Sequence, residues 1–196
     1  ILGAEGMGLY QMVYPIFTLL LVVATSGVPN AISRLISEKN ALGQKEYVRK
    51  IIRTSAWLML IIGLVFSLVL FVFADDFGVM QGNPMVGKAY KAISPSIVIV
   101  AMLSVFRGVF QGMGNMTPTA VSQIIEQLVK LVFGLLFAYL LLGEGSEYAV
   151  AGALLGITLS ELISLVYIGL VYARKKKSFS VKSIDTFTPS TKTVAC

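Results

Sequence analysis

The amino-acid sequence predicts an all-α protein, a polytopic bundle of membrane-spanning helices. Hydrophobic residues make up 56% of the chain, charged residues only 13%, and the mean hydropathy is +0.82. In a soluble domain, roughly a quarter of the residues are charged. The apolar residues also gather in long runs, and a helix of about 20 such residues crosses the hydrocarbon core of a bilayer. These observations together predict several transmembrane helices.

Five windows of the sequence are long and apolar enough to span a membrane, and they cover residues 10–33, 51–74, 92–111, 120–142 and 148–172. They predict a membrane domain over residues 1–174. The tail, residues 175–196, is rich in Ser, Thr and Lys and has no periodic apolar face. Such a composition is typical of a flexible loop, so we expect a cytoplasmic loop there.

The distribution of basic residues predicts the orientation of the bundle. Lys and Arg gather between the first and second spans and again after the fifth, and the positive-inside rule places these segments in the cytoplasm. The connections between the second and third spans and between the fourth and fifth are acidic or poor in cations, so they lie outside. The chain then starts outside, yet its start lacks the features of a signal peptide. We therefore expect an upstream helix to be missing from an original unit of at least six spans.

The first span contains helix-weakening residues near its cytoplasmic end. Gly27 and Pro29 follow one another closely, and proline removes a backbone donor and clashes with the preceding turn. A kink or an unwound segment is expected here. Ser26, Asn30 and Arg34 recur every four residues and therefore share one helix face.

The fourth span carries a polar stripe on an otherwise apolar helix. Its members recur at three- and four-residue spacing, and they are Thr119, Ser122, Gln123, Glu126, Gln127 and Lys130. The apolar remainder, residues 131–142, is only about 18 Å long and too short to cross the membrane alone. Glu126 and Lys130 are therefore expected inside the cytoplasmic half of the membrane, where their spacing allows them to pair.

Two interpretations of these charges remain open at this stage. In the first, Glu126 and Lys130 neutralise each other and hold helices together, while Arg107 extends to the cytoplasmic surface. In the second, the stripe lines a hydrated cavity, where such groups contact a substrate or a coupling ion. The continuity of the stripe favours the cavity.

The fifth span combines small residues with one carboxylate. Gly152, Gly156 and Ser160 recur every four residues, a pattern that allows a neighbouring helix to approach closely. Glu161 lies near the middle of the span and has no cation nearby in the sequence. It is either a group that responds to protons or sodium ions, or a partner in a hydrogen bond between helices.

The composition also excludes several kinds of chemistry. The only cysteine is Cys196 and the chain has no histidine, so neither an intrachain disulfide nor a zinc site of Cys and His ligands can form. We expect no metal, no cofactor and no enzymatic activity. The pI of about 9.5 fits cytoplasmic retention of Lys and Arg better than binding to nucleic acid.

Two stretches of the sequence resemble a known family. LGAEGMGLYQMVYPIFTLLLVVATSGVPNAISRLISEKNALG (residues 2–43) and FRGVFQGMGNMTPTAVSQIIEQLVKL (residues 106–131) are similar to the stage V sporulation protein B group of polysaccharide-biosynthesis membrane proteins. That group belongs to the superfamily of multidrug, oligosaccharidyl-lipid and polysaccharide exporters, together with the MurJ-type lipid II flippases. The resemblance extends from Leu2 to about Arg174.

The resemblance implies an alternating-access transporter in which two lobes of six helices surround a central cavity. This chain would be an incomplete first lobe, without its first helix and without the second lobe, followed by part of the interlobe loop. The family moves lipid-linked saccharides, such as undecaprenyl-pyrophosphate precursors, across the cytoplasmic membrane. The implied partners are therefore a lipid-linked saccharide and membrane lipid.

The same resemblance implies roles for individual residues. Cavity arginines of MurJ-type flippases hold the pyrophosphate, and the matching positions here are Arg34 and Arg107, together with Lys130. Their polar neighbours complete the predicted substrate site, and they are Asn30, Gln123 and Gln127. Glu126 and Glu161 are the predicted ion-coupling residues.

The predicted function is thus a flippase for cell-wall, spore-cortex or polysaccharide synthesis. One alternative is a cation-coupled multidrug exporter of the same superfamily. The carboxylates Glu126 and Glu161 favour this alternative, whereas the cations of the cavity argue against it. The other is a non-transporting membrane scaffold for envelope assembly. In a scaffold the polar stripe would face a partner helix with every group satisfied, whereas in a transporter it would face water.

Overall fold

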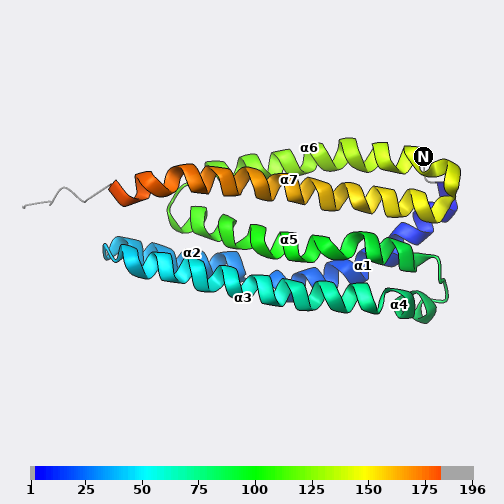
Figure 1. Cartoon of the computed structure of the whole chain (residues 1–196), viewed down its shortest axis with the longest axis horizontal. Coiled ribbons are helices and arrows are strands. Elements are labelled where there is room, and N and C mark those ends of the chain that lie inside the picture. Colours follow the sequence, from blue (N-terminus) through cyan, green and yellow to red (C-terminus); the bar gives the residue numbers. More distant parts are fainter. Residues whose placement is uncertain (1–2, 182–196) are drawn as a thin grey trace, which may run out of the picture.

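A computed structural model describes the backbone of residues 3–181 and the side chains of residues 3–175. All regular secondary structure in this range is helical, and five helical segments are long and apolar enough to cross a membrane. Figure 1 shows the long helices running side by side along one axis. The predicted all-α class with five spans is confirmed.

The helices, in chain order, are α1 (Gly3–Thr25), α2 (Val28–Ala41), α3 (Lys45–Val72), α4 (Ala74–Met80), α5 (Val86–Gly112), α6 (Thr117–Leu140), the short 3-10 helix η1 (Leu142–Glu144) and α7 (Ser146–Val181). Helix α7 extends into the segment 175–196, for which the sequence predicts a loop. The segment after Tyr172 contains Lys and Arg, which are good helix formers, and neither Gly nor Pro before Val181. The rest of the predicted loop, residues 182–196, lies outside the described residues.

The first expected span consists of two helices. Helix α1 ends at Thr25 and α2 begins at Val28, and Gly27 between them has a positive φ of 73°. Glycine adopts this left-handed conformation without steric cost, and Pro29 fits the first turn of α2, where no backbone donor is needed. The predicted interruption of the helix is confirmed, and α2 continues beyond the end of α1 (Figure 1).

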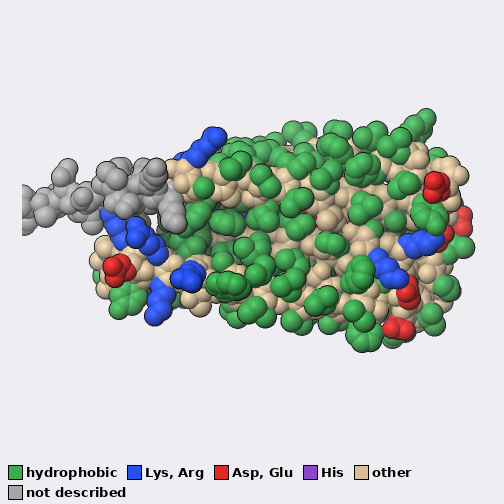
Figure 2. All heavy atoms as spheres, viewed as in Figure 1, with side chains coloured by type: hydrophobic (Ala, Val, Ile, Leu, Met, Phe, Trp, Pro, Cys, Tyr) green, Lys and Arg blue, Asp and Glu red, His purple; other side chains and the backbone are tan. Residues whose placement is uncertain are grey.

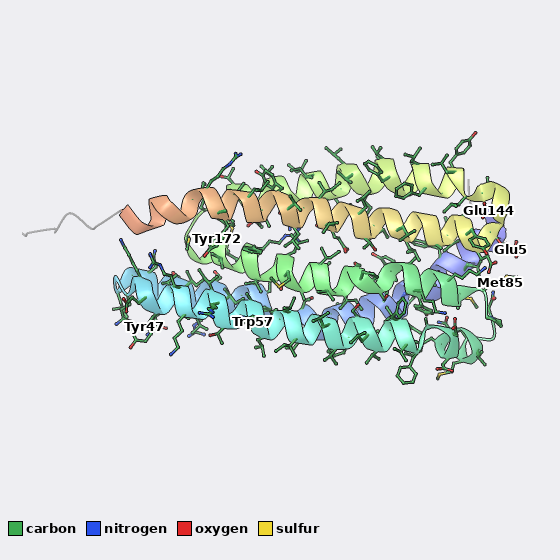
Figure 3. All side chains as sticks on the ribbon, viewed as in Figure 1. Glu5, Tyr47, Trp57, Met85, Glu144 and Tyr172 are labelled. Atoms are coloured by element: carbon green, nitrogen blue, oxygen red, sulfur yellow. The ribbon has the colours of Figure 1, made fainter. Side chains whose placement is uncertain are left out.

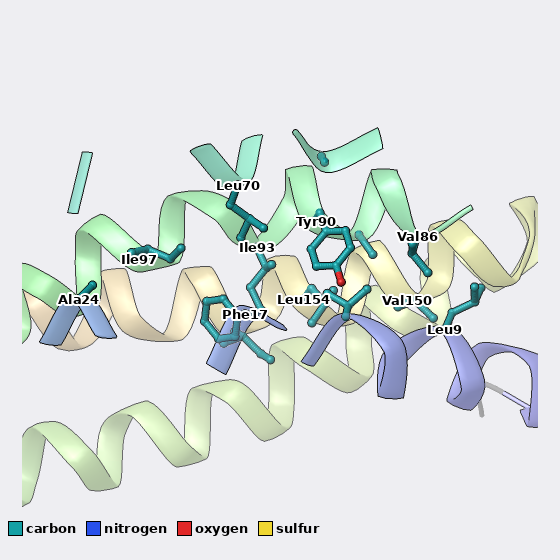
Figure 4. Packing of buried hydrophobic residues seen from close by; sticks show 14 residues of the cluster. Leu9, Phe17, Ala24, Leu70, Val86, Tyr90, Ile93, Ile97, Val150 and Leu154 are labelled. Carbon is teal, nitrogen blue, oxygen red and sulfur yellow. The ribbon is translucent and has the colours of Figure 1, made fainter. Parts of the chain in front are cut away.

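Helix α5 forms the centre of the bundle. It packs against α1, α2, α3, α4 and α7, and it is apolar around most of its circumference, as expected of a buried helix. Figure 4 shows Phe17 of α1, Ile93 of α5 and Leu154 of α7 meeting in the main hydrophobic cluster. The outer helices α3 and α6 instead expose large apolar side chains, among them Leu58, Ile61, Leu68, Leu128, Leu131 and Val132.

Small residues bring α7 into close contact with α6. A Cβ atom added to Gly156 would lie 2.5 Å from the backbone nitrogen of Gly134, and one added to Gly152 would lie 2.8 Å from the carbonyl oxygen of Phe137. Real Cβ atoms do not approach so closely, so these glycines are required by the packing. The predicted role of this small-residue row in helix contact is confirmed.

The two ends of the bundle differ in charge (Figure 2). At the end formed by α4, η1 and the start of α5, which we call the acidic end, Lys88 pairs with Glu147 at 2.8 Å and Lys91 pairs with Asp75 at 2.7 Å. These pairs join α5 to α7 and to α4. The opposite end, formed by α2 and the start of α3, is the basic end, and its cations are Arg34, Lys39, Lys45, Arg49, Lys50 and Arg53.

Candidate functional site

Three charged residues that the sequence singled out meet between α5 and α6. Arg107 Nη2 lies 2.7 Å from Glu126 Oε2, and Lys130 Nζ lies 3.6 Å from Glu126 Oε1. The side chain of Glu126 is 14% exposed and that of Arg107 is 19% exposed. Glu126 therefore balances two cations at once. We call Arg107, Glu126 and Lys130 the charged cluster.

The cluster differs from the interpretation in which Glu126 and Lys130 neutralise each other and Arg107 extends to the cytoplasmic surface. Glu126 and Lys130 do lie within ion-pair distance, but the closer partner of Glu126 is Arg107. Arg107 therefore extends toward α6, where it finds a carboxylate. A contact between residues 19 positions apart depends on how two helices pack, and helical periodicity within one span does not predict it.

The cluster retains hydrogen-bonding capacity. Among the described residues, the buried Arg107 Nε has no hydrogen-bond partner, and neither does the buried Thr119 Oγ1, which lies near the start of α6. A buried donor that stays unpaired costs roughly 1–3 kcal/mol. Arg107 can thus donate further hydrogen bonds while it keeps its pair with Glu126.

Glu161 lies in the interior between α5 and α7. It is only 3% exposed and accepts a hydrogen bond from Ser96 Oγ of α5. One of the two expected arrangements, a hydrogen bond between helices, is therefore present, and a coupling role stays a prediction. Nothing in the sequence relates Ser96 to Glu161, because 65 positions separate them.

A polar groove lies where α2 crosses the end of α5. Its volume is about 600 Å³, and its lining residues are Asn30, Ser33, Arg34, Ser37, Glu38 and Gln111. The five α2 residues recur at positions i, i+3, i+4, i+7 and i+8, which places them on one helix face. Asn30 and Arg34 were predicted as site residues, and this spacing could also have revealed Ser33 and Ser37.

Two glycines of α5 hold α2 in place beside the groove. An added Cβ at Gly108 would lie 2.8 Å from the carbonyl oxygen of Pro29, and one at Gly112 would lie 2.6 Å from that of Ser33. The backbone of α2 therefore rests directly on α5. This contact brings the Arg34 segment of α2 next to Gln111, which also lines the groove.

The groove and the charged cluster share one side of α5. Gln111 follows Arg107 by four residues, so the two side chains lie one above the other on that helix. Arg34 forms no ion pair with a carboxylate of the described residues. The groove does contain a carboxylate, that of Glu38, but its ion pair is with Lys39 at 2.9 Å.

Gln123 and Gln127 are not part of this arrangement. Both are exposed on α6, and neither lines the groove. Gln123 follows the buried Ser122, and Gln127 follows the partly buried Glu126. Successive side chains of an α-helix point about 100° apart around its axis, so both glutamines face away from these neighbours. The stripe that the sequence predicts is therefore wider than the face of α6 that contacts α5 and α7.

An apolar pocket borders the charged cluster. It has a volume of about 680 Å³ and lies between α1, α6 and α7. Met7 and Tyr10 of α1, Leu131 of α6 and Ile157 of α7 contribute to its wall, and Lys130 is the charged residue among those that line it.

The fold and the site define a polytopic membrane protein with ionisable groups held between its helices, and such groups usually mark a functional site. The family described as "Polysaccharide biosynthesis protein" matches residues 1–194, and the chain belongs to this family.

Similar proteins support this assignment. The chain is 36% identical to stage V sporulation protein B of Bacillus subtilis (strain 168) over 179 residues, which are 89% of this chain and 34% of that protein. It is 32% identical to the lipid II flippase MurJ of the same organism over 188 residues, 90% of this chain and 35% of the flippase. The chain thus spans about a third of the length of these relatives.

A solved structure shares the fold. The crystal structure of a MATE protein in complex with MaD3S has a TM-score of 0.79 to this chain at 20% identity. The match covers 97% of this chain and 43% of the MATE chain. This likeness concerns the arrangement of helices alone.

Proposed function

We propose that this chain forms one lobe of a flippase that moves a lipid-linked saccharide of the undecaprenyl-pyrophosphate type across the cytoplasmic membrane. The observation that carries the proposal is the groove of Arg34, which Gln111 of α5 also lines, one helical turn from Arg107 of the charged cluster. Membership in the polysaccharide biosynthesis family supports it. A B. subtilis relative named lipid II flippase supports it further.

Arg34 is the proposed first contact for the diphosphate. A guanidinium binds phosphate oxygens through two parallel hydrogen bonds. The carboxylate that lines the same groove, Glu38, forms its ion pair with Lys39 and not with Arg34. The amide groups of Asn30 and Gln111 line the same groove and suit the hydroxyl groups of a saccharide.

Arg107 is proposed to act later, because Glu126 already occupies one edge of its guanidinium. A diphosphate that reaches the cluster would share Arg107 and Lys130 with Glu126. Glu161, which is buried and bonded to Ser96 of α5, is the proposed group through which proton or ion binding shifts the balance between inward-open and outward-open states.

The second lobe would face the exposed side of α6. Gln123 and Gln127 are polar and exposed on a helix of a membrane bundle, and such residues usually face a protein interior or a water-filled cavity. A cavity between this lobe and a second one would give both side chains a polar environment. The partial coverage of the relatives by this chain leaves room for that second lobe.

The test is translocation of a fluorescent undecaprenyl-pyrophosphate saccharide in liposomes that contain the full-length protein. Arg34→Gln should slow movement at least about tenfold, because a hydrogen bond to a charged group contributes roughly 1.5–3 kcal/mol. Arg174→Gln, which removes an exposed cation near the end of α7, should leave the rate unchanged. A wild-type protein that leaves the lipid in place, or equal rates in the two variants, would contradict the proposal.

A cation-coupled multidrug exporter is the second candidate, and the buried carboxylate of Glu161 is the observation that favours it. The same liposomes distinguish the two functions when they are assayed with a fluorescent cationic dye under a proton or sodium gradient. Dye transport that Glu161→Gln abolishes, without any movement of the saccharide lipid, would select the exporter.

A further inference from the structure

Cations at the two ends of the bundle have different partners. At the acidic end, Lys88 and Lys91 are each paired with a carboxylate, and Lys88 also lies 3.9 Å from the centre of the Tyr148 ring. At the basic end, residues 28–53 include six basic side chains and two glutamates, Glu38 and Glu46. Lys50 and Arg53 have no ion-pair partner among the described residues. Net positive charge is therefore exposed at one end only.

These two cations lie on one face of α3 together with an aromatic residue. Lys50, Arg53 and Trp57 occupy positions i, i+3 and i+7, so they follow one another along the same side of the helix. All three are exposed, and Trp57 has 59% of its surface accessible. Figure 3 shows Trp57 on α3 and Tyr47 farther toward the basic end. We call Lys50, Arg53 and Trp57 the α3 rim.

The α3 rim lies at the boundary of the apolar surface of α3. Beyond Trp57, the exposed large side chains of this helix are apolar, and they include Leu58, Ile61, Leu64, Val65 and Leu68. Arg53 and Lys50 precede Trp57 by about 6 Å and 10 Å along the helix axis. Indole rings of membrane proteins concentrate at the level of the lipid headgroups. The two cations thus lie at headgroup depth or slightly above it.

We propose that the α3 rim binds the headgroups of anionic phospholipids in the surrounding leaflet. The charge of the rim is complementary to a phosphodiester, and its surface continues directly into the lipid-exposed face of α3. Glu46 also lies on this side of α3, but Arg49, Lys50 and Arg53 outnumber it. The site is separate from the groove, whose lining residues belong to α2 and α5.

Trp57 provides a direct measurement because it is the only tryptophan of this chain. The full-length protein, with any other tryptophan replaced by phenylalanine, is reconstituted in phosphatidylcholine vesicles that contain either brominated phosphatidylglycerol or brominated phosphatidylcholine. Bromine quenches indole fluorescence only at close range. We expect stronger quenching by the brominated phosphatidylglycerol, which reports enrichment of the anionic lipid around Trp57.

Charge variants assign this preference to the rim. A cation near a membrane surface changes the affinity for anionic lipid by about fivefold, so Lys50→Gln together with Arg53→Gln should abolish most of the preference. Both side chains are exposed and unpaired, so folding should survive. Lys88→Gln with Lys91→Gln removes the same charge at the acidic end and should leave the preference unchanged. High salt tests the same point without mutation. It should weaken the preference for the anionic lipid, because the Debye length falls from about 8 Å at 0.15 M to about 3 Å at 1 M.

Four results would overturn the inference. Equal quenching by the two brominated lipids would exclude enrichment at Trp57. A preference that survives both the rim variant and high salt would exclude an electrostatic site. Equal loss in the Lys88 and Lys91 variant would show a dependence on net charge alone. Loss of the preference in Arg34→Gln would place the anionic lipid in the groove instead of on the rim.

Discussion

Glu126 determines how the charges between α5 and α6 are arranged. It lies between Arg107 and Lys130, at 2.7 Å and 3.6 Å from their nitrogen atoms, and none of the three side chains is fully exposed. Removal of one partner from a largely buried pair leaves an uncompensated charge. This residue therefore supports the stability of the helix bundle and also limits how strongly Arg107 can bind another anion.

At the same scale, the hydrogen bond from Ser96 to Glu161 predicts a measurable loss of stability. Ser96→Ala leaves a buried carboxyl group without its donor, which should lower the free energy of unfolding by roughly 1–3 kcal/mol. Ser104→Ala is the matched control, because the hydroxyl of Ser104 bonds only to the carbonyl oxygen of Ala101 in its own helix. Thermal unfolding in detergent compares the two variants. Equal losses would show that the contact with Glu161 contributes no specific stability.

At the scale of helices, the close approach of α2 to α5 positions the groove. The backbone of α2 lies directly against Gly108 and Gly112, and Asn30 and Arg34 extend from that same segment of α2 into the groove. The interruption at Gly27 separates α2 from α1. The position of Arg34 thus depends on three glycines, none of which lines the groove.

Gly108→Ala tests this dependence. The added methyl group would contact Pro29 and Ile32 of α2, so the helices must separate, and overpacking of this kind costs roughly 1–3 kcal/mol. Gly169→Ala in α7, where no heavy atom lies within 4 Å of the new Cβ, should be neutral or stabilising by up to about 1 kcal/mol, because alanine favours helix more than glycine does. The difference between the two melting temperatures measures the contact. Similar melting temperatures would indicate that α2 does not rest on α5.

At the scale of the whole molecule, charge distinguishes the two ends of the bundle. Basic residues of α2 and α3 gather at one end, and the other end carries the carboxylates that pair with Lys88 and Lys91 (Figure 2). Cytoplasmic segments of membrane proteins are enriched in Lys and Arg. We therefore expect the basic end to face the cytoplasm.

Cysteine labelling checks this orientation. With Cys196 replaced by serine, Met85→Cys and Tyr47→Cys each place one thiol at an exposed site, and the two sites lie at opposite ends of the bundle (Figure 3). A membrane-impermeant maleimide should label Met85→Cys in intact cells, and Tyr47→Cys only after permeabilisation. The reverse pattern would show that the basic end lies outside.

The sequence could predict features that depend on residues of a single helix. The five apolar spans, the interruption near Gly27 and the close contact made by Gly152 and Gly156 all follow from composition or from periodicity within one helix. The structure shows each of them. The pairing of Glu126 with Lys130 also belongs to this group, because both residues lie on one helix.

Contacts between helices could not be predicted in the same way. Three features depend on the rotation and separation of packed helices. They are the ion pair between Arg107 and Glu126, the hydrogen bond between Ser96 and Glu161, and the exposure of Gln127. Helical periodicity identifies the residues that share a face, but it does not identify the neighbouring helix that this face contacts.

The sequence by itself determined that this is a membrane protein of helices, which residues are charged within its spans, and which family it resembles. Tertiary structure alone decided that Arg107 is held by a carboxylate of another helix, and that Arg34 of α2 and Gln111 of α5 line one groove. The physical reason is that membrane insertion depends on hydrophobicity summed along a single segment, whereas a site depends on side chains that different segments bring together.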